Sequence, residues 1–455
     1  MDYNYLLFGD NIWEAKSVIE KIVTSIRQNP LIDKVSDVKL KGCPAQAIYE
    51  FKYKTNNITI TCLGNYSLWI DKFPEVKKYI DYFDKPDVVL FSLNKKEIVA
   101  AGEFTDTVSV GNSQWQRAQR FVAAAILRIP FLAVYAFGED RSQGTLRESS
   151  AILTYSYLKL SCDSETPLFL IFKDSLYLNA HNQLRAKKGL GALSFPNGDE
   201  IIGSWFGLRL LNSIEKIDAL QKLEFKMQRF MFDNLYYDVQ NYSHKISLVD
   251  KDLPAYHSKL TQKTTNIEDI KKVPFKDFCI FDWSISGKEI NRSYFKKTVY
   301  PLVKKFFKTY NRGGKFAIAD KGYTKQIEEI LFKNYPPNKN QNWSSPFLEY
   351  NKPTVLIPLQ VWKKSHKNGG VSYGPNDPNG GESAIFPSLL DSINFNTTNI
   401  IYVFYGEYPF EWYTNFNNNG RKIYRAVNTI GKLLCVDNNG SDRKPESFKL
   451  IRRIV

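Results

Sequence analysis

Residues 86–105 read PDVVLFSLNKKEIVAAGEFT, and the fold of the surrounding chain is best inferred outward from this stretch. Two apolar runs, 87–92 and 97–105, flank the short segment 93–96, and this pattern predicts two antiparallel strands joined by a tight turn. Asp87 stands at the start of the first strand, and Glu103 stands near the end of the second. Because paired strands run in opposite directions, both carboxylates should lie at the same end of the hairpin and can face the same side.

Two carboxylates placed a few ångströms apart are suited to a hard divalent cation. Mg²⁺ prefers one or two carboxylates, with water and phosphate oxygens completing its shell. Such a cation activates water and neutralises charge on a phosphodiester during its hydrolysis. Asp87 and Glu103 are therefore the predicted metal ligands, and Mg²⁺ is the predicted cofactor.

The elements around this hairpin predict a mixed α/β fold, with a central mixed sheet flanked by helices. Apolar residues recur at helical spacing over 11–28, and short strands at 47–53 and 58–63 are expected to form a hairpin through Asn56-Asn57. Residues 73–83 form a short helix or a loop. After the hairpin, GNS at 111–113 is a helix start for 114–127, and 130–137 returns as a buried strand. The order is helix, strands, helix, strand.

This arrangement resembles the PD-(D/E)xK nuclease superfamily, in which type II restriction endonucleases are prominent. The matching residues are Pro86-Asp87, then Glu103-Phe104-Thr105, then the helix opened by GNSQWQRAQR, and the resemblance covers roughly residues 10–140. It implies a restriction-endonuclease-like core and a Mg²⁺-dependent phosphodiesterase with Asp87 and Glu103 as metal ligands.

The chain departs from the superfamily pattern at its third position, where Thr105 replaces the usual lysine. A threonine hydroxyl cannot act as a base near neutral pH. Polar residues of the following helix could take over this role, as could a lysine in the turn: Gln116, Arg117, Arg120 and, less favourably, Lys96. One alternative is that these helix residues form an ordinary polar face. Another is that the domain binds nucleic acid without cutting it. The intact carboxylate pair favours catalysis.

A rival frame, Asp37, Glu50 and Lys52, also spells D…ExK and retains the lysine. Its second strand runs into another hairpin and not into a helix, so a solvent-facing edge strand is the preferred interpretation. Glu14 and Glu20 on the first helix are candidate accessory ligands, although such residues are more often simply exposed.

The charge of the chain is unevenly distributed. The formal net charge is +15, but residues 1–150 hold 19 Lys and Arg against 18 Asp and Glu. Residues 288–325 are the densest basic part, with eleven Lys and Arg opposed by Glu289 and Asp320. An acidic partner explains such a concentration, and nucleic acid is the commonest one, whereas a solvated basic face is the alternative. The predicted phosphate contacts are Lys296, Lys297, Lys304, Lys305, Arg312 and Lys315.

Beyond residue 150 the patterns are weaker. Strands are expected at 154–160, 167–172, 316–319, 354–358 and 400–404, and helices at 214–235 and 291–310. Residues 363–382, rich in Gly, Asn and Pro, are predicted to form a long loop, either a groove-reading element or a plain surface insertion. We predict a catalytic domain over 1–150 and a basic α+β recognition region over 151–455, with a second boundary near 270.

Other classes of function are disfavoured. The five cysteines and four histidines are scattered without CxxC pairs, which argues against zinc sites and a disulfide scaffold. No GxxxxGK[ST] or HExxH motif occurs. The N-terminal residues lack a signal-peptide pattern, and the longest apolar stretch, 121–137, is interrupted by Arg128 and Pro130. We expect a soluble, cytoplasmic protein with no membrane partner.

These observations together predict an endonuclease that cuts double-stranded DNA, most simply a sequence-specific type II restriction endonuclease. Double-strand cutting needs two active sites, so a homodimer, or dimerisation on DNA, is expected. A restriction function would also imply a cognate methyltransferase encoded nearby. The alternatives are another defence or repair nuclease that acts on DNA or RNA, with a partner ATPase, and a nucleic-acid-binding protein without catalysis.

Overall fold

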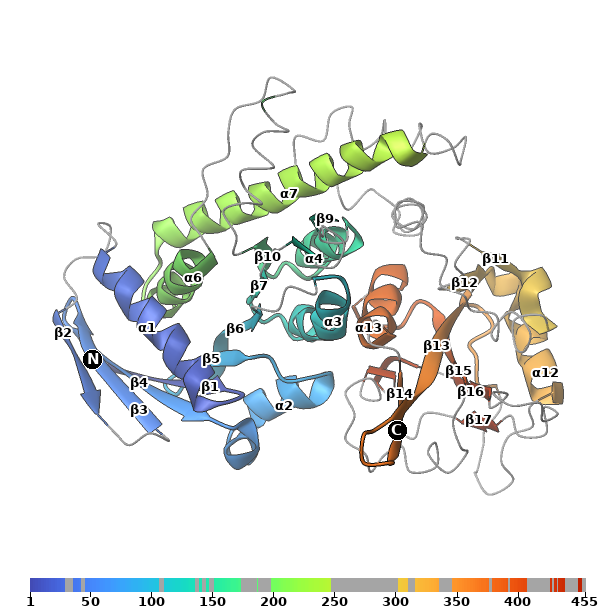
Figure 1. Cartoon of the computed structure of the whole chain (residues 1–455), viewed down its shortest axis with the longest axis horizontal. Coiled ribbons are helices and arrows are strands. Elements are labelled where there is room, and N and C mark those ends of the chain that lie inside the picture. Colours follow the sequence, from blue (N-terminus) through green and yellow to red (C-terminus); the bar gives the residue numbers. More distant parts are fainter. Residues whose placement is uncertain are drawn as a thin grey trace. The chain divides into compact units, whose positions relative to one another are not determined.

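The computed structural model divides the chain into two compact units (Figure 1). The first unit holds most of residues 1–241, and the second holds the C-terminal residues together with residues 115–122. The residues that the structure describes are 1–28, 36–41, 46–105, 110–135, 139–140, 145–146, 151–172, 186, 198–246, 302–309, 316–334, 346–375, 379–391, 393–406, 426–427, 429–431, 433–437 and 449–451.

An eight-stranded mixed sheet forms the centre of the first unit, with strand order β10-β7-β6-β5-β1-β4-β3-β2. The strands are β1 (Asp2–Gly9), β2 (Ser36–Lys41), β3 (Gln46–Tyr53), β4 (Asn56–Gly64), β5 (Val88–Ser92), β6 (Glu97–Thr105), β7 (Phe131–Tyr135) and β10 (Leu168–Phe172). The helices are α1 (Ile12–Gln28), α2 (Pro74–Tyr82), α3 (Val110–Leu127), α4 (Ala151–Ser164), α6 (Gly198–Asn212) and α7 (Asp218–Ile246), with residues 115–122 of α3 grouped with the second unit. The predicted mixed α/β class is confirmed, as are the β3–β4 and β5–β6 hairpins.

Sequence reasoning missed β1, which lies in the middle of this sheet. It pairs parallel with β4 and antiparallel with β5. The signal was present, because Tyr5-Leu6-Leu7-Phe8 is a short apolar run ended by Gly9, and all five of these residues are buried. A continuous apolar run of this length is typical of a strand covered on both faces.

The strand expected at 154–160 is wrong, because these residues belong to α4. Strand β10 lies parallel to β7, and parallel neighbours need a crossover connection that is usually a helix. In the same way α3 connects the parallel strands β6 and β7. Residues 154–158 are all buried, so the sequence offers no polar face by which to recognise a helix.

Helices α1 and α6 pack closely together on one face of the sheet (Figure 1). A Cβ atom added to Gly203 of α6 would lie 2.3 Å from the carbonyl oxygen of Lys21, so only glycine permits this approach. The Ser25 and Ser204 hydroxyls form a hydrogen bond of 2.9 Å across the contact. The sequence-predicted boundary near residue 150 thus falls inside the first unit, because α6 covers α1 and β10 extends the sheet.

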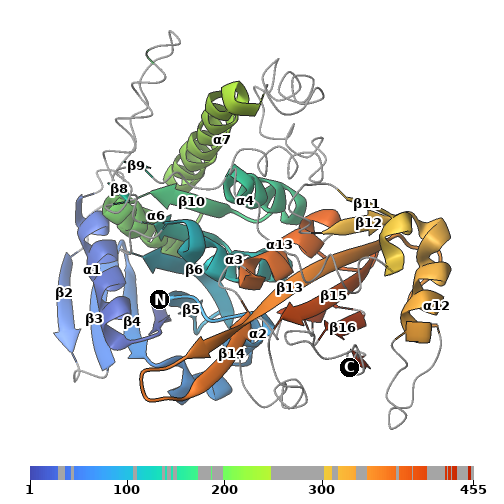
Figure 2. The same cartoon turned by 45° about the vertical axis from the view of Figure 1, so that its right-hand side comes forward.

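The second unit contains a seven-stranded sheet, with strand order β11-β12-β13-β15-β16-β17 and β14 paired with β13. Its elements are β11 (Phe307–Thr309), β12 (Ala317–Ala319), β13 (Thr354–Ser365), β14 (Val371–Pro375), β15 (Asn399–Gly406), β16 (Leu433–Asp437), β17 (Lys449–Ile451), α12 (Thr324–Asn334) and α13 (Asn379–Leu390). Helix α12 packs on the core of this sheet through Ile327 and Leu331 (Figure 2). The strands predicted at 316–319, 354–358 and 400–404 are confirmed.

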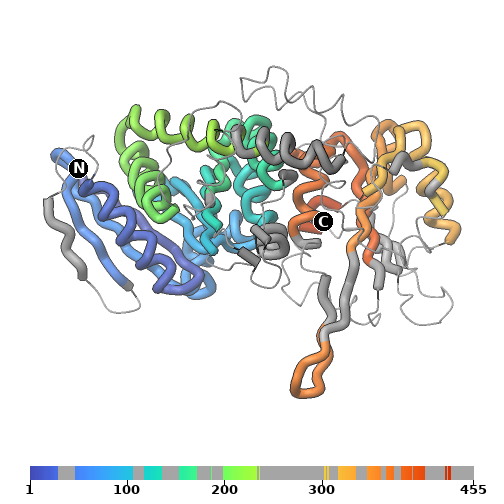
Figure 3. Tube along the Cα trace, turned by 45° about the horizontal axis from the view of Figure 1, so that its top comes forward, coloured from blue at the N-terminus to red at the C-terminus, as the bar shows by residue number. Residues whose placement is uncertain are grey.

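Two predictions in this unit need correction. The helix expected over 291–310 does not extend to its end, because Phe307–Thr309 pair with β12 as strand β11; residues 291–301 lie outside the described residues. The long loop expected over 363–382 contains the end of β13, all of β14 and the start of α13. The β13–β14 turn is closed by a hydrogen bond from His366 N to Gly370 O, and its tip projects from the sheet (Figure 3).

Within the described part of the chain, the helices are too short or too polar to span a bilayer.

Candidate functional site

The β5–β6 hairpin brings Asp87 and Glu103 to the same end of the central sheet. Val88 pairs with Gly102 and Val89 with Ala101, so continuing the register by one residue sets Asp87 opposite Glu103. Directly opposed residues of an antiparallel pair point to the same face. The Asp87 carboxylate is also fixed there, because its Oδ2 accepts a hydrogen bond of 2.6 Å from the backbone N–H of Phe104.

The two carboxylates differ in exposure. Glu103 is fully buried, whereas Asp87 is half-buried, so the pair meets solvent through Asp87. Burying a carboxylate is costly unless it is paired, hydrogen-bonded or bound to a metal, and the burial of Glu103 therefore indicates a specific polar environment. Thr105 is also buried and shares the face of Glu103, because alternate residues of a strand point to the same side.

A third carboxylate, Glu14, lies close to Asp87. The side chain of Asn11 accepts hydrogen bonds from the backbone N–H groups of Trp13 and Glu14, both 3.0 Å, which caps the N-terminus of α1. The backbone N–H of Asp10 donates to the Asp87 carbonyl oxygen at 3.1 Å, which ties this end of α1 to the start of β5. Burial, and then the charge of Asp87, raise the pKa of Glu14.

Glu14 is consequently the better of the two accessory ligands proposed from the sequence. Its Oε2 atom is shielded from solvent and accepts no hydrogen bond from any residue that the structure describes. Glu20 lies further along α1, is exposed, and forms an ion pair of 3.6 Å with Lys16. The burial of Glu14 beside Asp87 is what distinguishes the two.

Sequence reasoning missed Lys85, which precedes Asp87 by two residues. Lys85 forms an ion pair with Asp10, the residue whose backbone N–H donates to Asp87. A lysine therefore stands at the carboxylate end of the hairpin, although not at the position of Thr105. Its position directly before Pro86-Asp87 in the chain could have identified it as a candidate.

The four groups proposed to replace the missing lysine differ in position and exposure. Lys96 is exposed in the turn at the opposite end of the hairpin, five strand residues or about 17 Å from Asp87, so it cannot serve the carboxylates. Arg117 is half-buried and Arg120 is buried, one helical turn apart on α3. Arg120 is therefore not an exposed residue of that helix, and its catalytic role stays a prediction. The side chain of Gln116 lies outside the described residues.

Tyr157 lies close enough to Glu103 to interact with it electrostatically. Burial raises the pKa of Tyr157 well above its ordinary value, and the nearby Tyr135 and Glu103 add to the effect. Tyr157 belongs to α4 and Tyr135 ends β7. Because residues 154–160 read as a strand in the sequence, this contribution of α4 to the surroundings of Glu103 could not be anticipated.

The rival frame lies elsewhere on the sheet. Glu50 and Lys52 belong to β3, which β4 and β1 separate from β5. Glu50 is half-buried, pairs with Lys39 of β2, and is followed by the hairpin to β4 as the sequence predicted. Strand β2 is the edge of the sheet, so β3 is not the edge strand that was expected. Asp37 lies at a register irregularity of β2, and its side chain lies outside the described residues.

Little of the predicted phosphate-binding surface can be placed. Lys305 is exposed, with its Nζ atom 4.8 Å from the centroid of the Phe306 ring. The other predicted contacts lie outside the described residues, either wholly or in their side chains: Lys296, Lys297, Lys304, Arg312 and Lys315.

The donor set of the hairpin end suits Mg²⁺ better than a softer metal. Its groups are carboxylate oxygens, which hard cations prefer, and one of them, Glu14 Oε2, is shielded from solvent without a hydrogen bond from any described residue. Across the described parts of the chain, no group of three or more His, Cys, Asp and Glu side chains is placed to hold a metal ion. A site of one or two carboxylates completed by water and phosphate remains compatible with this geometry.

Comparisons with known proteins found no matching family model, no matching curated protein and no matching solved structure.

Proposed function

We propose that this protein is a Mg²⁺-dependent endonuclease that hydrolyses phosphodiester bonds of DNA, with a restriction-endonuclease-like core in its first unit. The observation that carries the proposal is the position of Asp87 opposite Glu103, with Asp87 held by the backbone N–H of Phe104. Asp87 and Glu103 would bind the cation, and the Glu14 carboxylate, on α1, lies beside Asp87.

Each residue of this end has a role that follows from its surroundings. The N–H of Phe104 fixes the orientation of Asp87, and the cap of α1 positions Glu14. When bound, Mg²⁺ would lower the pKa of a coordinated water and neutralise charge on the phosphate. Thr105 can donate or accept a hydrogen bond but cannot act as a base, so Gln116, Arg117 and Arg120 remain the proposed replacements for lysine.

The DNA would be held by the basic C-terminal residues, and phosphate contacts there would set affinity and register. We propose that the substrate is double-stranded DNA cut at a specific sequence, which would require a homodimer or dimerisation on DNA. Two observations favour a second candidate, a nucleic-acid-binding protein that does not cut: Thr105 stands in place of lysine, and Glu103 is fully buried.

A plasmid-cleavage assay with a matched pair of variants tests the proposal. Glu103→Gln should abolish cleavage in Mg²⁺ and leave DNA binding intact. Glu97→Gln is the control, because Glu97 lies on the same strand at the opposite end and its side chain is 53% exposed. Cleavage by Glu103→Gln would reject the metal assignment. A mobility shift of the plasmid without cutting by the wild-type protein would favour the binding-only candidate. A smear of plasmid fragments, or degradation of RNA added as a second substrate, would favour a less specific nuclease.

A further inference from the structure

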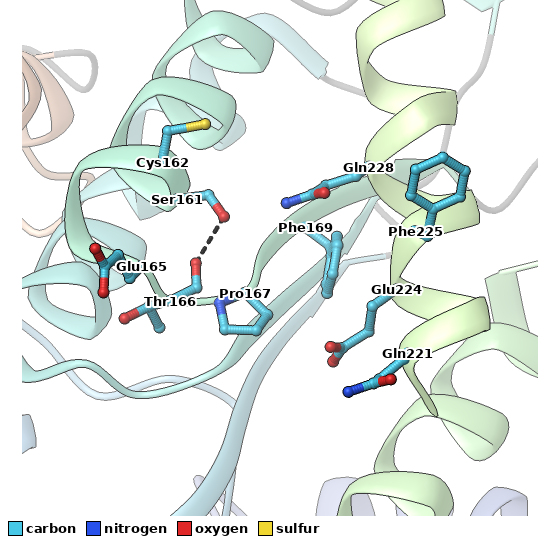
Figure 4. A pocket seen from close by; sticks show the side chains of 10 residues that line it. All are labelled: Ser161, Cys162, Glu165, Thr166, Pro167, Phe169, Gln221, Glu224, Phe225 and Gln228. Atoms are coloured by element: carbon cyan, nitrogen blue, oxygen red, sulfur yellow. Dashed lines mark hydrogen bonds between the residues drawn. The ribbon is translucent and has the colours of Figure 1, made fainter. Parts of the chain in front are cut away.

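A cavity of about 530 Å³ lies in the first unit, and none of the hairpin residues described above is among its described lining residues (Figure 4). It is formed by the end of α4, the segment that leads into β10, and one face of α7. The residues that line it include Glu165, Phe169, Gln221, Glu224, Phe225 and Gln228. Cavities of this size accommodate small organic groups such as a heteroaromatic ring.

The α7 face of this cavity combines polar and aromatic groups. Gln221, Glu224, Phe225 and Gln228 recur at helical spacing, and the side chains of Gln221, Glu224 and Gln228 extend from α7 toward the opposite wall (Figure 4). Phe225 is 70% exposed at the rim, whereas Phe169 is fully buried in the wall. Two primary amides can each donate and accept, and an exposed phenyl ring offers a surface for stacking.

Glu224 is a fixed hydrogen-bond acceptor in this cavity. Its Oε1 atom accepts from Trp205 Nε1 at 2.8 Å and from Arg209. Because both bonds use Oε1, the Oε2 atom is left to accept from a ligand. Burial raises the pKa of Glu224, while the charge of Arg209 opposes that rise. The Glu224–Arg209 ion pair is locally neutral, and the lining also holds the carboxylate of Glu165. No Lys or Arg is among the described lining residues, so the ligand group that the cavity suits is flat, not anionic and rich in N–H donors.

The same stretch of α7 also carries three basic residues. Lys222, Lys226 and Arg229 are exposed, and each directly follows a lining residue in the chain. Exposed cations on the helix that forms one wall of the cavity could hold the phosphates of a nucleic-acid strand, because these stay in solvent while a base enters the protein. Unstacked bases are commonly stacked on aromatic rings and read on their Watson–Crick edges.

We infer that this cavity receives one unstacked nucleobase of a nucleic-acid strand, with the strand's phosphates on Lys222, Lys226 and Arg229. A base that carries an exocyclic amino group would donate to Glu224 Oε2, with Gln221 and Gln228 bonding its other edge atoms and Phe225 stacking on its ring. The inference rests on the nucleic-acid binding of the proposed function, but not on Asp87, Glu103 or cleavage.

Fluorescence anisotropy with end-labelled duplexes tests this assignment, in EDTA so that no cleavage occurs. One duplex has a single bulged adenine, a second has a bulged thymine, and a third is fully paired. The wild-type protein should bind the bulged-adenine duplex about tenfold more tightly than the other two. Equal affinities for all three, or binding to none of them, would overturn the assignment.

Variants of exposed residues identify the cavity as the origin of that preference. Phe225→Ala and Gln228→Ala should each remove most of the tenfold preference, whereas Leu68→Ala, which removes an exposed apolar side chain that does not line the cavity, should retain it. Lys222→Gln should weaken all three duplexes alike. A preference that survives Phe225→Ala and Gln228→Ala would contradict the inference.

Free adenosine separates a strand-borne base from a small nucleoside ligand. Adenosine that binds as tightly as the bulged duplex, together with no effect of Lys222→Gln, would overturn the inference of a strand. A protein that cuts no plasmid yet shows the bulge preference would refute the nuclease proposal and leave the cavity assignment standing.

Discussion

Replacement of Gly203 by alanine tests how α6 holds α1, the helix that carries Glu14. The added Cβ would lie 2.3 Å from the carbonyl oxygen of Lys21, 2.7 Å from its carbon and 3.1 Å from Ser25 Cβ. The first two are backbone atoms, which no rotamer change can move aside. Alanine gains about 1 kcal/mol of helix propensity over glycine. Overpacking costs about 1–3 kcal/mol, and a contact this short belongs at the upper end, so we expect a net loss of about 2 kcal/mol.

Gly207→Ala is the matched control, one helical turn further along the same face of α6. There the added Cβ would lie 3.1 Å from Ile26 Cγ1, an atom of a side chain that can adjust. The propensity gain is the same, so this variant should be between neutral and about 1 kcal/mol more stable. Urea unfolding followed by circular dichroism gives both values from the shift in midpoint. A Gly203→Ala protein as stable as Gly207→Ala would refute the close packing of α1 on α6.

Three further predictions follow from individual contacts. Because the pKa of Glu14 is raised in the folded protein, the folded state holds that proton more tightly than the unfolded chain, and stability falls as pH rises from the ordinary carboxyl value through the raised one. Glu14→Gln should therefore raise the melting temperature at pH 8 without Mg²⁺ and weaken Mg²⁺ binding; an unchanged melting temperature would contradict this. Arg209→Met removes the ion-pair partner of Glu224 in a site where the two side chains are 14% and 17% exposed. The free energy of unfolding should fall by about 2–3 kcal/mol at pH 7, less than the 3–5 kcal/mol of fully buried pairs, and should partly recover at pH 5. A loss of stability that does not depend on pH would argue against the ion pair. Lys305→Gln should weaken DNA binding for all sequences and reduce the slope of log affinity against log salt by about 0.9; an unchanged slope would remove Lys305 from the phosphate contacts.

The hairpin at the centre of the fold could be predicted from sequence because its signals are local. Apolar runs separated by a short polar turn specify β5 and β6, and the same rule found the β3–β4 hairpin. The strand misassigned at 154–160 and the helix expected up to residue 310 show where local patterns fail. Pairing with distant strands decides these segments, and residues 154–158 of α4 are all buried.

Only part of the candidate site could be predicted from the sequence, because the rest depends on contacts between distant elements. Strand direction alone places Asp87 and Glu103 at one end of the hairpin, and register then sets them opposite each other. The approach of Glu14 depends on Asn11 capping α1 and on Asp10 bonding to Asp87, which the sequence does not encode as a spacing. The cavity beside α7 depends on how α4, β10 and α7 pack, so no sequence motif identifies Glu224 or Phe225 as lining residues.

Calorimetric titration of Mg²⁺ into the full-length protein tests the two-carboxylate cation site most directly. The wild-type protein and the Glu97→Gln control should each bind Mg²⁺ with one site per chain. Asp87→Asn and Glu103→Gln should each weaken that binding at least about tenfold, which corresponds to 1.4 kcal/mol per variant. Binding of unchanged affinity in both variants would show that these carboxylates do not hold the cation.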